Sequence, residues 1–395
     1  MRLADLLSPL PVDRFMGEIF DRRPLHIPAE PEGRKAPIGW PRMSELLAIR
    51  THWSEANIRM ILNGRPVLAD LYIDEVDTLG GRVRRADPAK VDIFLAMGAS
   101  MVANSIEDIC PEAREITAAL GSHFAARAGA NAYCSFRDVQ AFRSHCDLHD
   151  VFAVQCEGEK MWTLYENRAA APVAEIAGDD AQAIIDSVKG RALMQVRMRP
   201  GDLLYIPRGF YHDALASSQA SLHVTFSVKP LDGRILFRLI EDMAIEDEAF
   251  RAYLPDARLD DGRPLAERLD RLADRVSALL RSSRFAAELG QRQRALAEPN
   301  DLVSLPLQRK LEFFARSDRP AELARDGEGA VLSCSGGKAA IGALEVPAQW
   351  ILERAGFSHQ ELAARFRAFD PEDLRALVAR LEKLNLVFRY QPKAD

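Results

Sequence analysis

The sequence predicts an α+β protein in which helical segments lie before and after a β-rich core of the jelly-roll kind. Six short runs of β-forming residues occur between residues 131 and 228, separated by glycine, proline or polar turn residues. Outside this region, hydrophobic residues recur at the spacing of amphipathic helices. These observations predict a barrel or sandwich of short strands. The runs are NAYCSF, DVFAVQ, KMWTLY, LMQVRM, DLLYI and SLHVTFSV.

The composition is typical of a globular protein with more than one domain. A chain of 395 residues exceeds the usual size of a single core, and its residues are 48% hydrophobic and 28% charged. The net charge of −6 argues against nucleic acid as a charge-driven partner. Five scattered cysteines without a CxxC pair predict a reducing compartment. No long apolar run is present, so we expect a cytoplasmic protein without a signal peptide or membrane span.

Helical spacing dominates the first part of the chain. A short helix precedes Pro24, and the short strand LHI follows it. Residues 74–78 are interpreted as the entry to a loop, and the next basic residues as a solvated face: Arg82, Arg84 and Arg85. Pro111 starts a helix that we expect to reach about residue 129, because acidic residues lie in its first turn and glycine at its end.

From about residue 231 the β pattern gives way to helices. One helical stripe indicates either packing within the chain or a helical pair that forms a dimer: Leu265, Leu269, Leu272, Val276 and Leu279. Residues 295–335 are interpreted as a connector with some strand. Three short helices and the strand LVFRY follow, the first helix starting at Pro347, which suggests a winged-helix module. Its near-neutral charge favours contact with protein rather than DNA.

Two histidines and an aspartate in the β region have the pattern of a metal site. A strand through residues 144–155 would place His145 and Asp147 on one face. His212 follows in GDLLYIPRGFYHDA, where glycines and a proline provide the turns that redirect the chain. Two histidines and one carboxylate form the facial triad that holds non-haem Fe(II) while leaving coordination positions open.

Neighbouring residues leave alternatives open. His149 shares strand parity with His145 and Asp147, so it is either a competing ligand or a pocket residue. His223 either points into the barrel or packs in the core, and Thr225 shares its parity. Cys146 would face away from the ligands on a regular strand and is therefore interpreted as a packing residue.

These motifs resemble those of the cupin superfamily and, more specifically, of its JmjC branch. The pattern G-x5-P-x-G-x2-H, which ends at His212, is similar to the second cupin motif. The segments NAY, HCDLHDVF and GEKMW resemble the ribosomal oxygenases, a group of JmjC Fe(II)/2-oxoglutarate protein hydroxylases. FMGEIFDRRPLHI, PRGFYHDA and SLHVTFS also fit that group.

The resemblance implies a double-stranded β-helix core and a role for each motif residue. The implied catalytic iron ligands are His145, Asp147 and His212. Lys160 would pair with the far carboxylate of 2-oxoglutarate, because a buried carboxylate needs an opposite charge, although a hairpin lysine is the simpler alternative. Thr225 is expected to contact the cosubstrate. The residues expected on the substrate side are Asn131, Tyr133 and Arg208.

The implied function is hydroxylation of a protein side chain with Fe(II), 2-oxoglutarate and O2, and the leading target is an arginine or histidine of a ribosomal protein. Alternatives are a hydroxylase of a free amino acid or peptide natural-product precursor, and a non-enzymatic cupin binding or regulatory module. We expect three regions: residues 1–230 with N-terminal helices and the catalytic domain, 231–320 as a helical dimerisation region, and 321–395 as a winged-helix-like domain. A homodimer is expected, without membrane or direct nucleic-acid contact.

Overall fold

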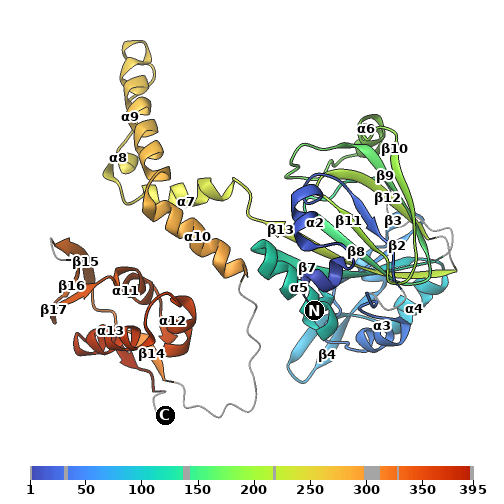
Figure 1. Cartoon of the computed structure of the whole chain (residues 1–395), viewed down its shortest axis with the longest axis horizontal. Coiled ribbons are helices and arrows are strands. Elements are labelled where there is room, and N and C mark those ends of the chain that lie inside the picture. The colour runs from blue at the N-terminus through green and yellow to red at the C-terminus, as the bar shows by residue number, and fades with distance from the viewer. Residues whose placement is uncertain are drawn as a thin grey trace. The chain divides into compact units, whose positions relative to one another are not determined.

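A computed structural model of the chain describes residues 2–30, 34–136, 143–216, 219–297, 312–326 and 329–391 (Figure 1). The chain divides into two compact units, Met1–Asn300 and Asp301–Asp395, and each has its own hydrophobic core. Strand β14 (Phe313–Arg316) belongs to the second unit, so the division falls before the expected boundary at residue 320. None of the helices in these ranges has the length and apolar character needed to cross a membrane.

The first unit opens with short elements that cover the β core. These are α1 (Leu3–Leu7), α2 (Val12–Glu18), β1 (Leu25–Ile27), α3 (Trp40–Leu47), β2 (Ile58–Leu62), β3 (Arg65–Pro66), β4 (Ile73–Thr78), β5 (Gly81–Ala86), α4 (Pro88–Ala96), β6 (Ser100–Ala103) and α5 (Pro111–Phe124). The predicted helix before Pro24 and the strand LHI are confirmed as α2 and β1.

Two details of this part differ from the prediction. Residues 74–78 belong to β4, which pairs with β5 in a hairpin rather than entering a loop. The alternation of acids on β4 with arginines on β5 accounts for this, since Arg82 pairs with Asp77 at 3.1 Å. Helix α5 ends at Phe124, short of residue 129, because Ala125 adopts a left-handed conformation (φ 46°) and a strand begins at once.

Two antiparallel sheets form the β core (Figure 1). The eight-stranded sheet has the order β1-β11-β8-β13-β7-β6-β2-β3, and the three-stranded sheet has the order β10-β9-β12. All six predicted runs are strands. The core elements are β7 (Ala126–Phe136), β8 (Asp150–Glu157), β9 (Lys160–Arg168), α6 (Ala181–Val188), β10 (Ala192–Met198), β11 (Leu203–Ile206), β12 (Phe210–Ala216) and β13 (Ala220–Pro230).

Side-chain alternation divides the large sheet between two hydrophobic cores. On β8, Phe152 and Val154 pack with the helical cover, whereas Val151 and Ala153 pack between the sheets with Trp162 of β9. Both faces of β8 are therefore buried, which explains its almost continuous apolar sequence. The space between the sheets is where β7, β9, β12 and β13 can present polar side chains to one another.

Four helices complete the first unit: α7 (Ile235–Ala244), α8 (Glu248–Arg251), α9 (Arg263–Leu280) and α10 (Ser283–Ala297). Leu239 and Met243 of α7 form a small cluster with Phe285 of α10, and Leu279 packs against it. Helix α9 has no buried residue, and Leu269 in its apolar stripe is 50% exposed.

The second unit combines small sheets with three helices. Its elements after β14 are β15 (Ala321–Asp326), β16 (Gly329–Cys334), β17 (Gly337–Gly342), α11 (Glu345–Leu352), β18 (Gly356–Ser358), α12 (His359–Arg365), α13 (Pro371–Lys383) and β19 (Val387–Arg389). The predicted capping box of Ser358 and Glu361 begins α12. Helix α11 starts two residues before the predicted Pro347 and ends at Leu352, because Gly356 already belongs to β18. Of the predicted connector, residues 298–311 lie outside the described ranges.

Candidate metal centre and its cavity

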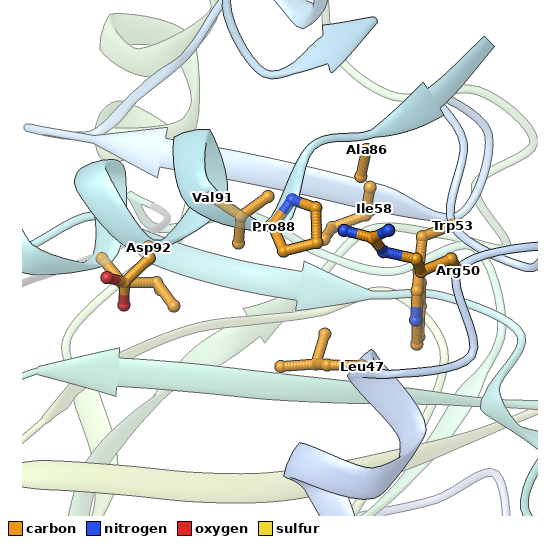
Figure 2. Close-up of a pocket in the computed structure, with 9 residues that line it drawn as sticks. Leu47, Arg50, Trp53, Ile58, Ala86, Pro88, Val91 and Asp92 are labelled. Atoms are coloured by element: carbon orange, nitrogen blue, oxygen red, sulfur yellow. The ribbon is translucent and has the colours of Figure 1, made fainter. Parts of the chain in front are cut away.

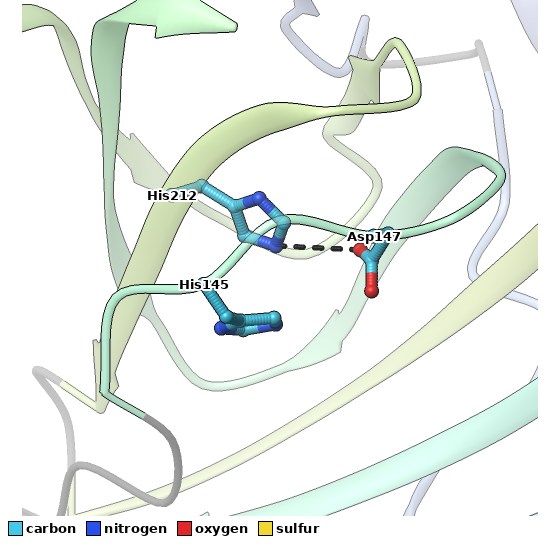
Figure 3. A group of neighbouring side chains, drawn as sticks. All are labelled: His145, Asp147 and His212. Atoms are coloured by element: carbon cyan, nitrogen blue, oxygen red, sulfur yellow. Dashed lines mark ion pairs between the residues drawn. The ribbon is translucent and has the colours of Figure 1, made fainter. Parts of the chain in front are cut away.

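Three side chains converge at the candidate metal centre, as Figure 3 shows. His145, Asp147 and His212 each offer one ligand atom, and these atoms all lie within 4.8 Å of one another. His212 Nε2 is 3.4 Å from Asp147 Oδ2, and the two imidazole centroids are 4.5 Å apart. The three residues that the sequence proposed as a facial triad therefore lie close enough to share one ion.

The predicted strand through residues 144–155 is only partly present, because β8 begins at Asp150. His145 instead forms an isolated antiparallel bridge with His212, in which His145 N donates to His212 O (3.0 Å) and His212 N to His145 O (2.8 Å). Gly209 N also donates to Asp147 O at 3.0 Å. Backbone pairing with the segment around β12, rather than strand parity, brings the ligands together.

Hydrogen bonds fix the ligating nitrogen of each histidine. His145 Nδ1 lies 2.9 Å from Arg143 O, and His212 Nδ1 lies 3.0 Å from Phe210 O. A carbonyl oxygen only accepts, so each Nδ1 must carry the proton, and Nε2 is then the ligand atom of each ring. Such bonds also hold the ring orientation that a metal ion requires.

Electrostatics favour the protonation states that bind a cation. Burial, together with the nearby His145, lowers the pKa of His212 to about 4. Burial alone would raise the pKa of Asp147, but the surrounding histidines, His212 foremost, outweigh it and hold that pKa below its ordinary value. At neutral pH the centre therefore offers a neutral imidazole from His212 and a carboxylate from Asp147, as metal binding requires.

A cavity of about 720 Å³ extends from the three ligands between the two sheets. Alternation on β7 and β13 turns one polar row toward it: Tyr133 pairs with His223, and Asn131 with Thr225. The rings of Tyr133 and His223 stack with centroids 4.7 Å apart. This row forms one polar wall of the cavity.

Lys160 lies on the same cavity and is only 4% exposed. Its Nζ lies 3.3 Å from Ser135 Oγ and 3.5 Å from His223 Nδ1, and no carboxylate pairs with it among the residues that the structure describes. Burial lowers the pKa of Lys160 to about 7. The buried indole Nε1 of Trp162, on the same cavity, also lacks a hydrogen-bond acceptor in the described ranges. These donors fit an anionic ligand beside a metal ion.

Most of the predicted pocket residues line this cavity. Asn131, Tyr133 and Thr225 do, and so do the histidines left open by the sequence, His149 and His223. His149 is not a member of the ligand group, since its Nδ1 lies 3.2 Å from Asp150 O.

Two residues are placed differently from the prediction. Arg208 is not among the described residues that line the cavity, and its carbonyl accepts a hydrogen bond from Arg168 Nε at 2.7 Å. The corner around Gly209 directs His212 inward without turning Arg208 to the same side. Cys146 lines the cavity instead of facing away, because the segment that carries it is not a regular strand.

Sequence reasoning missed the residues around the cavity that lie outside the motifs. Glu175, Asp179 and Gln182 come from the segment between β9 and β10, and Arg59 comes from β2. The signal that could have found the first three is the long polar insertion between two predicted strands, because long connections often carry functional residues. No comparable signal marks Arg59.

A second, smaller cavity of about 150 Å³ lies between α3, α4 and neighbouring strands (Figure 2). Its wall is mostly apolar, and Ile58 and Val91 lie between the charged residues Arg50 and Asp92. It shares no lining residue with the larger cavity and contains no group of metal-ligating side chains among the described residues. Among the described residues, the group of metal-ligating side chains lies on the larger cavity.

Comparison with known proteins agrees with this geometry. Residues 107–234 match the JmjC domain family. This segment of the chain is a JmjC domain. Human ribosomal oxygenase 1 is 28% identical to the chain over 229 residues, covering 56% of the chain and 33% of the human protein. A Dictyostelium discoideum protein named bifunctional lysine-specific demethylase and histidyl-hydroxylase NO66 is 35% identical over 148 residues, covering 36% of the chain and 28% of that protein.

The chain spans about a third of the length of the curated relatives it matches. Among solved structures, the Escherichia coli ribosomal oxygenase YcfD in complex with cobalt and 2-oxoglutarate matches with a TM-score of 0.51 and 16% identity, covering 97% of this chain and 99% of that chain. The YcfD complex with cobalt and succinic acid gives a TM-score of 0.50 and 17% identity over the same shares. These likenesses show a shared fold and confirm the jelly-roll core predicted for the JmjC domain.

Proposed function

We propose that the protein is an Fe(II)- and 2-oxoglutarate-dependent oxygenase that hydroxylates an amino-acid side chain of a protein, with an arginine or histidine of a ribosomal protein as the target. The observation that carries this proposal is the combination of two features in one cavity. The His145, Asp147 and His212 group suits a divalent metal ion, and Lys160 is a buried cation without a carboxylate partner in the described ranges.

In this proposal the chain's residues divide the work of binding. The Nε2 atoms of His145 and His212 and the carboxylate of Asp147 hold the iron. Lys160 pairs with the far carboxylate of 2-oxoglutarate, which supplies the charge that its burial leaves unneutralised. Thr225 lies on the same cavity wall as Asn131 and Tyr133 and contacts the cosubstrate in this proposal. When bound, iron, 2-oxoglutarate and O2 supply the oxidation, in which the cosubstrate becomes succinate and CO2 and one oxygen atom enters the substrate C–H bond.

The relatives' names support a protein substrate, since they include ribosomal oxygenase and histidyl-hydroxylase. The acidic residues Glu175 and Asp179 on the cavity suit a basic target side chain. In this proposal the cavity holds the reacting carbon near the metal ligands, and such positioning is the protein's main contribution to the reaction.

The test is an incubation with Fe(II), 2-oxoglutarate, O2 and ribosomal proteins from cells that lack this protein. We expect succinate to form and one ribosomal protein to gain the mass of one oxygen atom, read by NMR and mass spectrometry. Oxygen gain on free amino acids but not on protein would favour the small-molecule hydroxylase. Release of formaldehyde would indicate demethylation, and no turnover with any substrate would contradict the proposal.

We also propose that residues 231–297 mediate homodimerisation and that the second unit is a winged-helix-like module for protein contact. What supports the dimer is α9, an amphipathic helix of 18 residues without a buried side chain. What supports the module is its set of three helices with the small sheet β18-β14-β19 and its nearly balanced charge.

A further inference from the structure

We propose that Asp213, which follows the ligand His212 in the sequence, is a positioning residue for the metal centre and acts through Ser144. The inference rests on the proposed function, because it assumes that His145, Asp147 and His212 hold a metal ion. It concerns side chains that the sequence patterns did not single out.

Asp213 is the acceptor at the centre of a small hydrogen-bond network. Ser144 Oγ donates to Asp213 Oδ2 at 2.7 Å, and Tyr165 OH donates to the same oxygen at 2.6 Å. Lys189 Nζ donates to Ser144 Oγ at 3.0 Å and lies 4.4 Å from the centroid of the Tyr165 ring. The Ser144 hydroxyl thus donates once and accepts once, and the carboxylate receives two charge-assisted bonds.

The network joins the two chain segments that carry the ligands. Ser144 precedes His145, and Asp213 follows His212, so the bond between Ser144 and Asp213 lies directly beside the backbone bridge of the two histidines. The segment with His145 and Asp147 precedes β8 and has no strand of its own. The bridge, the Gly209 bond and this side-chain link therefore determine where those ligands sit.

Asp213 does not contact the ligand cavity itself. On β12 the side chains of His212 and Ala214 turn toward the cavity, whereas Asp213 lies on the other face, next to Tyr165 of β9. Neither Asp213, Tyr165 nor Lys189 is among the described residues that line the cavity. Asp213 can therefore affect metal binding through the position of the ligand segments or through the effect of its charge on His212, and Ser144→Ala, which leaves that charge in place, isolates the first route. Ser144, which is 5% exposed, is the link.

The experiment is a Co(II) titration of the full-length apoprotein, followed by the visible absorption of the bound ion, without cosubstrate or turnover. The variants are Asp213→Ala, Ser144→Ala and the double substitution. We expect each single substitution to weaken Co(II) binding by roughly tenfold, the lower end of the effect of outer hydrogen-bond partners on metal affinity. The double variant should bind no more weakly than Asp213→Ala, because both substitutions break the same link.

Asp202→Ala is the matched control. Asp202 is a buried carboxylate that, like the half-buried Asp213, ties chain segments together, accepting from Ala29 N at 2.7 Å and Arg199 N at 3.0 Å, but it does not line the cavity. We expect it to lower the melting temperature at unchanged Co(II) affinity. If Asp202→Ala weakens Co(II) binding as much as Asp213→Ala does, the effect is general destabilisation and the positioning role is wrong.

The remaining outcomes are equally decisive. The inference is overturned if the Co(II) affinity of Asp213→Ala stays within twofold of the parent's. It is also overturned if the affinity loss of the double variant equals the product of the losses in the two single variants. Should Asp213→Ala not fold, Ser144→Ala decides alone, since it removes one oxygen atom, and unchanged affinity overturns the inference. If the parent protein binds no Co(II), the proposed function is overturned as well. If the parent binds Co(II) but the variants behave as the parent does, only the role of Asp213 is wrong.

Discussion

Burial of the Lys160 amine lowers the stability of the folded protein, and this destabilisation indicates the role of the residue. It is buried without a carboxylate partner in the described ranges, and burial lowers its pKa from 10.5 to about 7. Below pH 7 the folded protein carries this buried charge, and the penalty fades as pH rises toward 10.5, where the unfolded chain also loses the proton. A residue that destabilises the empty protein is expected where binding, rather than folding, requires the charge.

This cost predicts that Lys160→Met stabilises the apoprotein. The free energy of unfolding should rise by on the order of 1 kcal/mol at pH 6, and the gain should shrink at pH 9, since the parent then holds a neutral lysine. Thermal melts of both proteins at the two pH values measure the difference. If the stability gain of Lys160→Met over the parent is smaller at pH 6 than at pH 9, the account of Lys160 is wrong.

The same pKa predicts how pH affects cosubstrate binding. If protonated Lys160 receives a carboxylate of 2-oxoglutarate, the dissociation constant should increase as pH rises above 7, because the free protein must first take up a proton. Calorimetric titration between pH 6.5 and 8.5 with a redox-inert metal would measure this trend. Lys160→Arg is the control, since arginine keeps its charge throughout and its affinity should not follow the same slope. An equal slope for both proteins would contradict the assignment.

At the scale of elements, the corner before β12 is the piece that assembles the metal centre. Gly209 has a φ of +87°, a Cβ there would lie 2.5 Å from Ala169 O, and its N–H bonds to Asp147 O. The sequence pattern was informative at this corner for a physical reason: only glycine allows both the backbone conformation and the close approach.

Gly209→Ala should therefore disturb both stability and metal binding. Gly98→Ala is the control, because Gly98 has a φ of +88° with open space around it. We expect Gly98→Ala to lower the free energy of unfolding by about 1–2 kcal/mol through backbone strain alone. Gly209→Ala should lower it by roughly 1–3 kcal/mol more, because of the clash, and should also weaken Co(II) binding. Equal melting temperatures for the two variants would show that the corner tolerates a side chain.

The strands of the core were predictable because their alternation and length are local properties of the sequence. Strand parity placed Thr225 on the same side as His223, whose direction the sequence left open, and period-2 geometry holds along β13; Tyr133 was expected in the pocket from the family resemblance. Strand alternation does not determine the position of the His145–Asp147 segment, which precedes β8. Its geometry comes from the backbone bridge between His145 and His212, which are far apart in the sequence, and a local sequence pattern carries no information about such a long-range bridge.

The same limit explains the residues that were misplaced or missed. Arg208 was expected on the substrate side of the cavity, but it is not among the described residues that line the cavity. Asp213 and Tyr165 meet only because β12 pairs with β9, so their bond was invisible before the register was known. Motifs located the ligands, and tertiary pairing determined the residues that support them.

For the whole molecule, the apolar stripe of α9 predicts self-association. Leu269 is 50% exposed on a helix without buried residues, so a second copy of the chain would cover an otherwise solvated apolar face. We expect the parent to have twice the monomer mass in light scattering and Leu269→Glu to shift it toward the monomer. Arg271→Glu, a charge change at an exposed position of the same helix, is the control. A parent that is monomeric at high concentration would contradict the dimer.

The measurement that tests the central claim most directly is an anaerobic titration of the apoprotein with Fe(II) and 2-oxoglutarate. A visible charge-transfer band should appear in the parent, disappear in His212→Ala and require more 2-oxoglutarate in Lys160→Met. That result would establish that His212 and Lys160 serve one iron and cosubstrate site. A folded parent that gives no band, or a His212→Ala variant that keeps it unchanged, would contradict the oxygenase assignment.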